Sequence, residues 1–327
     1  MTAPLSEDDL IARFFAPIAG EGAFALKDDA ACYAPPPGHD LVVTKDALVA
    51  GVHFFADDPP GAIARKALRV NLSDLAAKGA DPAGFLLALA LPTDWRADWL
   101  EAFARGLGED AARYNCPLLG GDTVKTPGPL TLSITAFGTT PAGAMVKRFA
   151  ARPGDAIYVT GTIGDAALGL ALRGDPPFAA RLANVERAHL VDRYLLPRPR
   201  VAAATAMRDH ARAGMDVSDG LVGDLEKMIR AGDVGARVDL SAIPLSDAAR
   251  AAIGGEAALF EAAITGGDDY ELLACLSPGR AAAFENAMRA AGVPLARIGE
   301  VVAGAGVVWR DADGAPRVFT RGAYQHF

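Results

Sequence analysis

Hydrophobic and polar residues recur along the first half of the chain in patterns that predict both strands and helices. Apolar or alternating runs at 40–46, 84–91 and 130–137 predict strands, because side chains on a strand alternate between its two faces. The amphipathic pattern from 57 to 78 predicts a long helix. Its apolar stripe carries Asp74, a carboxylate where packing alone favours a hydrophobic residue.

The second half repeats this mixture after a change of composition. The loop-forming residues Arg-Pro-Gly-Asp occupy 152–155 and are followed by a new strand and helix. We therefore expect two mixed α/β domains, 1–150 and 151–327, in an α/β fold of the α+β-like kind. Within the second domain we expect a strand at 270–276 and a terminal hairpin that turns at 311–314.

Composition then narrows the function classes. The chain has 327 residues, of which 51% are hydrophobic and 22% charged, as is typical of a soluble folded protein. Its net charge of −8 argues against nucleic-acid and anionic-membrane partners, and we expect neither. The three cysteines form no C-x-x-C pair, and the acidic N-terminus is unlike a signal peptide. We expect a cytoplasmic protein.

Several common catalytic signatures are missing from the sequence. It contains no G-x-x-x-x-G-K-S/T phosphate loop, no H-E-x-x-H and no G-x-S-x-G. A G-x-G-x-x-A match at 106–111 lies late in a helical pattern instead of after a strand, so it does not indicate a dinucleotide fold. The sequence therefore does not indicate a P-loop enzyme, a zinc hydrolase or a serine hydrolase.

Aspartates at the ends of apolar segments are the main chemical signal. They are Asp28, Asp29, Asp46, Asp74, Asp122, Asp216 and Asp219. Each alone has a structural alternative, as a turn residue or a helix N-cap. Two carboxylates 4 Å apart repel by about 4 kcal/mol at an effective dielectric constant of about 20, so several in one cleft must hold cations. Oxygen ligands favour Mg²⁺, and such Mg²⁺ usually also binds phosphates, which points to a nucleotide.

Three further features suit phosphate binding. The backbone N–H groups of Gly120-Gly121-Asp122 can approach a phosphate closely, and Ser218 can donate to another. Arg148 is either a phosphate clamp or a solvated surface charge.

Longer motifs then carry a resemblance. They are GVHF at 51–54, NLSDLAAKGADP at 71–82, LLGGDT at 118–123, PGDAIYVTGTIGDAALGL at 153–170, DVSDGL at 216–221, GGDDYELL at 266–273 and the ending YQHF. With these motifs in the same order over nearly the full chain, the sequence resembles the thiamine-monophosphate kinase family. That family belongs to a superfamily with aminoimidazole ribonucleotide synthetase, selenophosphate synthetase and a hydrogenase maturation protein.

The resemblance implies a reaction and an assembly. The γ-phosphoryl group of ATP passes to thiamine monophosphate, giving thiamine diphosphate and ADP in thiamine diphosphate biosynthesis, with several Mg²⁺ ions and ATP as co-substrate. The N-terminal domain would bind ATP and Mg²⁺ and pair its sheet with that of a dimer mate into a barrel, forming a homodimer. The C-terminal domain would complete the nucleotide and substrate site. An acceptor phosphate is already ionised near neutral pH, so we expect direct in-line transfer without a phosphoenzyme.

Residue roles carry over from the matching motifs. Those implied for metal ligation are Asp29, Thr44, Asp46, Asp74, Asp122, Asp216 and Asp219. Those implied for ATP are Gly121, Asp122, Arg148 and Ser218, and those for thiamine monophosphate are His53, Asp268 and Tyr324. The expected catalytic residues are Asp46, Asp122 and Arg148. From the sequence alone, His53 has the alternative of a surface or cap histidine, and Tyr324 that of a packing residue.

Two lysines depart from the family pattern. Lys27 stands where the first acidic motif usually has Gly, and Lys45 where the next usually has Thr. We expect Lys27 to reduce turn flexibility, and Lys45 either to supply positive charge near ATP or to weaken one metal site. Another ATP-dependent enzyme of the superfamily, of ligase or dehydratase type, and a non-catalytic ATP-binding regulator remain as alternatives. Cys32 lies after the first acidic motif, so we interpret it as a buried packing residue.

Overall fold

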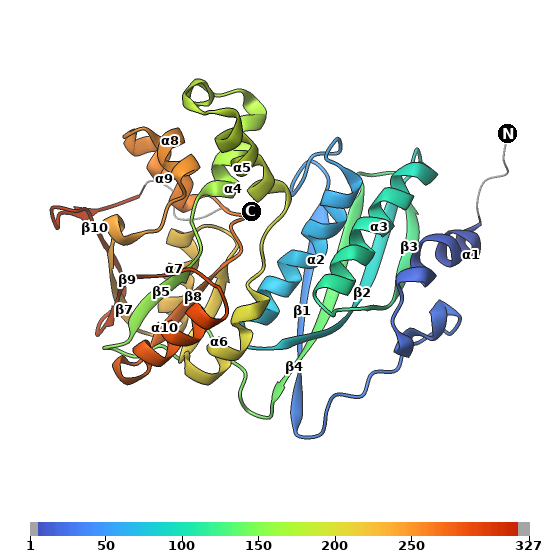
Figure 1. Cartoon of the computed structure of the whole chain (residues 1–327), viewed down its shortest axis with the longest axis horizontal. Helices are drawn as coiled ribbons and strands as arrows, with labels where there is room; N and C mark the ends of the chain where they lie inside the picture. Colours follow the sequence, from blue (N-terminus) through green and yellow to red (C-terminus); the bar gives the residue numbers. More distant parts are fainter. Residues whose placement is uncertain (1–5, 320–327) are drawn as a thin grey trace. The chain divides into compact units, whose positions relative to one another are not determined.

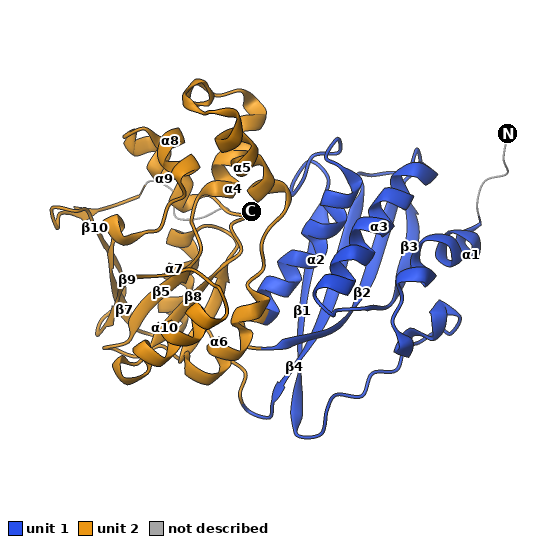
Figure 2. Ribbon diagram, viewed as in Figure 1, with its two compact units in different colours: residues 1–75, 80–143 blue, residues 76–79, 144–327 orange. Residues whose placement is uncertain are grey.

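A computed structural model of the protein describes residues 6–319, which fall into two compact units (Figure 2). The first unit contains residues 1–75 and 80–143, and the second contains residues 76–79 and 144–327. The main division therefore lies at 143/144, where composition alone places a boundary near 150. Each unit has its own sheet and its own hydrophobic core.

The first unit is built on a mixed sheet of four strands in the order β1-β4-β2-β3. The strands are β1 (His39–Val49), β2 (Asp81–Pro92), β3 (Leu118–Thr126) and β4 (Thr131–Pro141). Strand β4 runs antiparallel to β1 and β2, while β3 is parallel to β2 at the edge. The strands expected from apolar patterning at 40–46, 84–91 and 130–137 are confirmed as β1, β2 and β4.

Two helices, α2 (Pro60–Ala77) and α3 (Ala97–Arg113), cover one face of this sheet (Figure 1). Ile63, Ala67 and Val70 of α2 are buried, as the amphipathic pattern predicts. Asp74 is half-buried on the same stripe. One face of the sheet therefore packs against the helices as core, and α2 places the Asp74 carboxylate at the margin of that core.

The opposite face of the sheet leaves apolar side chains in contact with solvent. Leu41, Val43, Leu86 and Val124 are between 36% and 55% exposed. Strands alternate their side chains between two faces, and these four residues come from β1, β2 and β3 of the same sheet, in which β4 lies between β1 and β2. We refer to this face below as the open face.

The second unit contains a sheet of seven strands in the order β11-β10-β7-β9-β5-β8-β6. Its strands are β5 (Ala156–Thr160), β6 (Ala213–Val217), β7 (Gly235–Asp239), β8 (Glu271–Leu276), β9 (Leu295–Val302), β10 (Gly306–Arg310) and β11 (Pro316–Arg317). Its helices are α4 (Asp165–Ala171), α5 (Asn184–Leu195), α6 (Ala204–His210), α7 (Leu221–Ala231), α8 (Asp247–Ile253), α9 (Ala257–Thr265) and α10 (Ala281–Ala290).

Core packs on both faces of this second sheet. Leu273 of β8 belongs to a cluster with Leu225 and Met228 of α7, whereas Leu272 belongs to another with Met207 of α6 and Phe284 of α10. Every residue of β8 is buried. A strand covered on both faces is held rigidly, so β8 gives a fixed base to the segment that precedes it.

The mixed α/β class and the terminal hairpin are confirmed, since β10 and β11 pair antiparallel across the turn at 311–314. Sequence patterning missed β3 and β9, and both strands contain glycines that the sheet requires. A Cβ on Gly121 would lie 1.9 Å from the carbonyl oxygen of Leu87, and one on Gly299 would lie 2.2 Å from that of Arg237. Glycine usually signals a turn, but here it permits close backbone approach within a strand.

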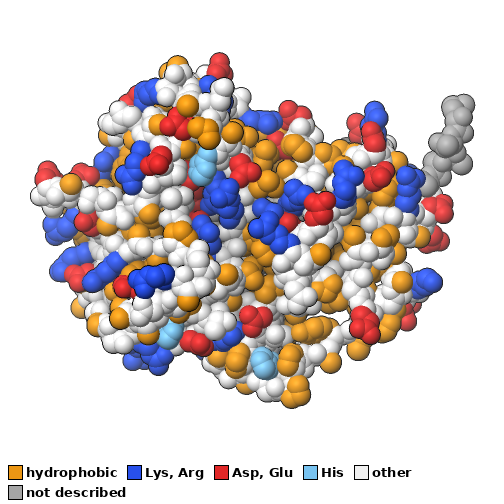
Figure 3. Space-filling model, viewed as in Figure 1, with side chains coloured by type: hydrophobic (Ala, Val, Ile, Leu, Met, Phe, Trp, Pro, Cys, Tyr) orange, Lys and Arg blue, Asp and Glu red, His pale blue; other side chains and the backbone are white. Residues whose placement is uncertain are grey.

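Acidic and basic side chains are interspersed on the face of the molecule drawn in Figure 3. Among residues 6–319, none of the helices combines the length and the apolar character that crossing a membrane requires. The cytoplasmic location and the barrel formed with a dimer mate stay predictions.

Candidate functional site

A pocket of about 810 Å³ opens on the open face of the first unit's sheet. Its walls include Asp29, Lys45, Gly121 and Asp122, which come from three separate sequence motifs. Asp29, Lys45 and Asp122 are all exposed. The pocket thus brings together the acidic motif around Asp29, the Gly-Gly-Asp motif, and Lys45, one of the two unusual lysines.

The Gly-Gly-Asp motif lies within strand β3, not after the end of an apolar segment as expected. Gly121 is paired with Leu87 of β2, and Asp122 with Ala88. Because the Leu87 carbonyl occupies the space that a Cβ at residue 121 would need, only glycine fits this edge strand without displacing β2. Close packing of the backbone therefore fixes where the Asp122 carboxylate projects.

Thr44, Asp46 and Asp74 lie on the helix-covered side of the same sheet. Asp46 is paired across the sheet with Ile134, which is fully buried under the helices. The Thr44 hydroxyl donates a hydrogen bond to the Asp74 carboxylate of α2. None of these three residues lines the pocket. The predicted metal residues of the first unit therefore form two sets, one at the pocket and one beneath α2.

Across residues 6–319, no three histidine, cysteine, aspartate or glutamate side chains lie close enough together to hold a metal ion between them. The carboxylate and hydroxyl oxygens that the two sets offer nevertheless suit a hard cation. Mg²⁺ in nucleotide enzymes is commonly bound by one or two carboxylates, with phosphate and water oxygens completing the octahedron. The donor set fits that mode and not an all-protein cage.

His53 lies in the turn after β1 and is half-buried. Its Nδ1 accepts a hydrogen bond of 3.0 Å from the backbone N–H of Val49, so the proton of the neutral ring is on Nε2. Lys66 of α2 donates to the His53 carbonyl oxygen at 3.2 Å. The Val49 N–H thus orients the ring at Nδ1, Lys66 holds the backbone of the same residue, and Nε2 carries the ring proton.

Lys27 and Cys32 lie on either side of the first acidic motif. Lys27 has a φ of −102°, an ordinary value, whereas Phe24, Ala25 and Leu26 before it all have positive φ. The positive φ values of this segment therefore lie ahead of the lysine, and position 27 itself does not need glycine; the reduced turn flexibility stays a prediction. Cys32 is exposed, so its interpretation as a buried packing residue is wrong.

In the second unit, residues 216–219 include the end of β6 and the two residues after it, which are held by helix α7. Asp216 of β6 is 7% exposed, and Val217 after it is fully buried. The backbone N–H groups of Ser218 and Asp219 both donate to the carboxylate of Asp224, at 2.9 and 2.8 Å. Lys227 forms ion pairs with Asp219 and Asp224. Burial raises the pKa of Asp224, and the hydrogen bond from Lys227 counteracts that rise.

Residues 266–270, which precede β8, lie directly against residues 216–219. The Asp268 N–H donates to the Ser218 carbonyl at 2.8 Å, and the Tyr270 N–H to the Val217 carbonyl at 2.8 Å. A Cβ at Gly267 would lie 2.3 Å from the Ser218 carbonyl oxygen. Two motifs about fifty residues apart are thus joined by their backbones, because β6 and β8 are antiparallel neighbours.

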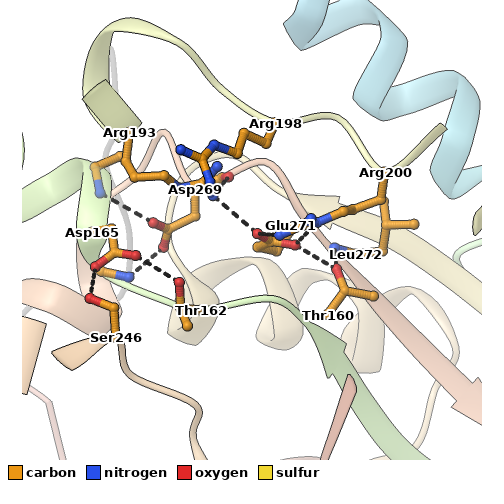
Figure 4. Close-up of polar contacts among 12 residues, drawn as sticks. Thr160, Thr162, Asp165, Arg193, Arg198, Arg200, Ser246, Asp269, Glu271 and Leu272 are labelled. Carbon is orange, nitrogen blue, oxygen red and sulfur yellow. Dashed lines mark hydrogen bonds and ion pairs between the residues drawn. The ribbon is translucent and has the colours of Figure 1, made fainter. Parts of the chain in front are cut away.

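A buried polar network anchors Asp269 and Glu271, at the junction of residues 266–270 with β8 (Figure 4). Glu271 is fully buried and accepts from the guanidinium groups of Arg193, at 3.0 Å, and Arg200, at 2.6 Å. Asp269 is 1% exposed, and burial raises its pKa well above the usual range for a carboxyl. No sequence motif pointed to these partners, since each arginine is about seventy or more residues from Glu271 along the chain.

Two further predicted residues remain to be placed. Arg148 is exposed in a turn at the start of the second unit. Tyr324 falls outside the described residues, so its role stays a prediction.

Comparison with known proteins identifies the family. The model of the AIR synthase related protein N-terminal domain matches residues 27–140, and that of the corresponding C-terminal domain matches 152–311. A thiamine-monophosphate kinase from Caulobacter vibrioides is 46% identical over 310 residues, which cover 93% of this chain and 86% of that protein. The chain belongs to the thiamine-monophosphate kinase family. The resemblance inferred from the motifs is therefore confirmed.

Solved structures of thiamine-monophosphate kinases share this fold. The enzyme from Stenotrophomonas maltophilia is 40% identical with a TM-score of 0.80, over 89% of this chain and 91% of that one. A second structure, AaThiL complexed with AMPPCP and TMP, is 30% identical with a TM-score of 0.78, over 92% of this chain and 91% of that one. The chain is therefore similar to a protein whose solved structure contains AMPPCP and TMP.

Proposed function

We propose that this chain transfers the γ-phosphoryl group of ATP to thiamine monophosphate, producing thiamine diphosphate and ADP. The observation that carries the proposal is the match, over nearly the whole chain, to thiamine-monophosphate kinases that include a structure with AMPPCP and TMP. The pocket and the two backbone-linked motifs of the second unit contain residue types that this reaction needs. They are carboxylates for Mg²⁺, hydrogen-bond donors for phosphate oxygens, and a carboxylate for a cationic ring.

We assign Mg²⁺ binding to Asp29 and Asp122 at the pocket, to Thr44, Asp46 and Asp74 beneath α2, and to Asp216 and Asp219 in the second unit. Bound Mg²⁺ would neutralise phosphate charge and so lower the repulsion between donor and acceptor. In the described structure Lys227 already pairs with Asp219, so a cation at that residue has to compete with the ammonium group.

We assign phosphate binding to two groups of hydrogen-bond donors, one in each unit. In the first unit, Gly121 exposes its backbone beside the Asp122 carboxylate at the pocket. In the second unit, Ser218 and the exposed Arg148 are suitable donors. Asp46, Asp122 and Arg148 are the proposed catalytic residues, acting on charge and alignment. Neither a serine nor a cysteine nucleophile is required, because the acceptor phosphate itself attacks in line.

Recognition of thiamine monophosphate is assigned to His53, Asp268 and Tyr324. The Nε2–H of His53 is a donor suited to a phosphate oxygen. The carboxylate of Asp268 is suited to the positively charged thiazolium ring. An aromatic side chain such as Tyr324 would stack on the same cation.

The open face of the first unit's sheet is the surface we assign to a second copy of the chain. Pairing two such sheets would cover the exposed Leu41, Val43 and Leu86 and close a barrel. A homodimer with a cytoplasmic location is part of this proposal. Size-exclusion chromatography with light scattering measures the assembly directly, and a monomer at micromolar concentration would reject it.

The activity is tested by incubating the purified chain with ATP, MgCl₂ and thiamine monophosphate and separating the products. We expect thiamine diphosphate and ADP in equal amounts, and no product when EDTA replaces the metal. ATP binding measured by calorimetry, together with no turnover across a series of Mg²⁺ concentrations, would reject the kinase and favour a non-catalytic ATP-binding regulator.

A further inference from the structure

Residues 268–271 alternate between two environments. Asp268 and Tyr270 are half-buried, whereas Asp269 and Glu271 are 1% and 0% exposed. The half-buried pair is linked, since the Tyr270 hydroxyl donates to the Asp268 carboxylate at 3.3 Å. One pair of side chains therefore lies on the accessible side of the segment, and the other lies inside the second unit.

The backbone of the accessible pair is strained. Asp268 has a φ of 73° and Tyr270 a φ of 51°, both in the left-handed region. Aspartate tolerates that region better than most residues, but a bulky tyrosine rarely adopts it. Such a conformation persists only where the surrounding structure fixes it, and it is typical of ligand-binding sites.

Asp269 supplies one of the fixing contacts. Its Oδ2 accepts from the N–H of Gly164 at 2.8 Å, and its Oδ1 from the N–H of Ala166 at 3.4 Å. Both donors belong to the first turn of α4, so the carboxylate ties residues 266–270 to a helix far away in the sequence. Desolvation disfavours the carboxylate, and these hydrogen bonds offset part of that effect.

Glu271 supplies the second fixing contact. Besides its two arginines, it accepts from the Thr160 hydroxyl of β5 at 2.7 Å. Arg193 also donates to the carbonyl oxygen of Asp269 at 3.4 Å, so the guanidinium group binds a backbone oxygen as well as a side chain. Helix α5, the loop after it and strand β5 therefore all converge on this two-carboxylate anchor (Figure 4).

We propose that Asp269 and Glu271 are positioning residues for substrate recognition: from the buried side they hold Asp268 and Tyr270 in the left-handed conformation, in which the Tyr270 hydroxyl orients the Asp268 carboxylate towards the cationic ring of thiamine monophosphate. This inference rests on the proposed function. It adds Tyr270 to the recognition of the acceptor as the residue that orients Asp268, and Asp269 and Glu271 as the residues that fix the backbone of both.

The central test is Asp269→Asn, which keeps the size of the side chain but places an amide where two N–H groups need acceptors. We expect the KM for thiamine monophosphate to rise about tenfold while the KM for ATP changes by less than about twofold. Glu271→Gln is expected to give the same split. Calorimetric titration of thiamine monophosphate alone should show the same loss of affinity.

A matched control separates positioning from stability. Asp155 is also buried in the second unit and accepts from a backbone N–H, that of Arg152 at 2.8 Å, and from the Arg212 guanidinium at 3.1 Å. Asp155→Asn is expected to lower the Tm as Asp269→Asn does, but to leave both KM values unchanged. If Asp155→Asn produced the same split, the inference would be overturned.

Tyr270→Phe keeps the inference testable if the carboxylate variants fail to fold, because it removes one hydroxyl from a half-buried ring. We expect a rise of about threefold in the KM for thiamine monophosphate and none in that for ATP. An unchanged KM in an active, folded variant overturns the inference. A wild-type chain that does not phosphorylate thiamine monophosphate rejects the proposed function itself, so the two failures are distinguishable.

Discussion

The two units present their predicted site residues in opposite ways. At the pocket of the first unit, Asp29, Lys45 and Asp122 are exposed on an open sheet face. In the second unit, residues 216–219 and 266–270 are held by Asp224, Asp269 and Glu271, all of which are almost fully buried. The first unit has exposed charged side chains at a pocket, whereas the second has loops whose backbone conformation is fixed by buried carboxylates.

The difference follows from the chemistry assigned to each region. Metal and phosphate sites can be completed by the ligands themselves, because cations and phosphates bring oxygen partners and cancel the repulsion among carboxylates. Recognition of one organic acceptor depends on geometry that exists before binding, since ordering a loop on binding reduces affinity. Variants at the pocket of the first unit and at the buried anchors of the second should therefore affect different measurements, turnover for the first and stability and the KM for thiamine monophosphate for the second.

The largest effect is expected for Glu271→Ala. Removing the carboxylate leaves Arg193 and Arg200 without their buried counter-charge, which lowers the free energy of unfolding by about 3–5 kcal/mol. Urea unfolding monitored by circular dichroism measures this. Glu300→Ala, which breaks the half-exposed pair with Arg237, is the matched control and should have a much smaller effect. Equal losses from the two variants would show that burial does not distinguish them.

Asp122→Ala should be the next largest, and its effect should appear in turnover instead of stability. Asp122 is exposed, so the Tm should stay near that of the wild type. Loss of a group that stabilises developing charge typically lowers kcat by about 10²–10³-fold. Steady-state assays at saturating ATP measure it. A folded variant with near-normal kcat would remove Asp122 from the proposed catalytic residues.

The role of Lys45 at the pocket is testable through Mg²⁺ dependence. If its ammonium group supplies part of the positive charge near ATP, Lys45→Thr should raise the Mg²⁺ concentration needed for half-maximal rate by up to about fivefold. Lys125→Thr is a suitable control, because Lys125 is an exposed lysine of β3 that does not line the pocket. A response shared by the two variants would indicate a general surface-charge effect.

The smallest effect is expected for Lys27→Gly, which restores the usual residue of the motif. Lys27 adopts an ordinary φ of −102°, so glycine relieves no strain and only adds freedom to the unfolded chain. The free energy of unfolding should fall by about 0.5–1 kcal/mol, with kcat unchanged. An increase in stability would show that the lysine is strained after all.

Sequence patterning located what depends on local order. Alternating runs identified β1, β2 and β4, and the stripe of α2 singled out Asp74, which the structure pairs with Thr44. The acidic motifs were recognisable because the residue types themselves carry the chemistry. Two of these motifs, around Asp29 and Asp122, do reach one pocket.

What the sequence could not supply depends on contacts between distant residues. Nothing near Glu271 in the chain indicates Arg193, Arg200 or Thr160 as partners, because strand order brings them together. Strand β3 was hidden by its glycines, and the positive φ of Tyr270 runs against the preference of its residue type. Long-range packing decides each of these features.

The pairing of β6 with β8 has a consequence for substitutions at the site. Residues 216–219 and 266–270 leave the same end of two adjacent strands, yet each is fastened by its own buried carboxylates. On the roles proposed here, substitutions at 268 and 270 would change part of the contact with the acceptor, alongside His53 and Tyr324, while the loop at 216–219 and the buried arginines are kept. Under the proposed function, the residues that would select the acceptor are thus held by anchors different from those of the residues that would handle phosphate.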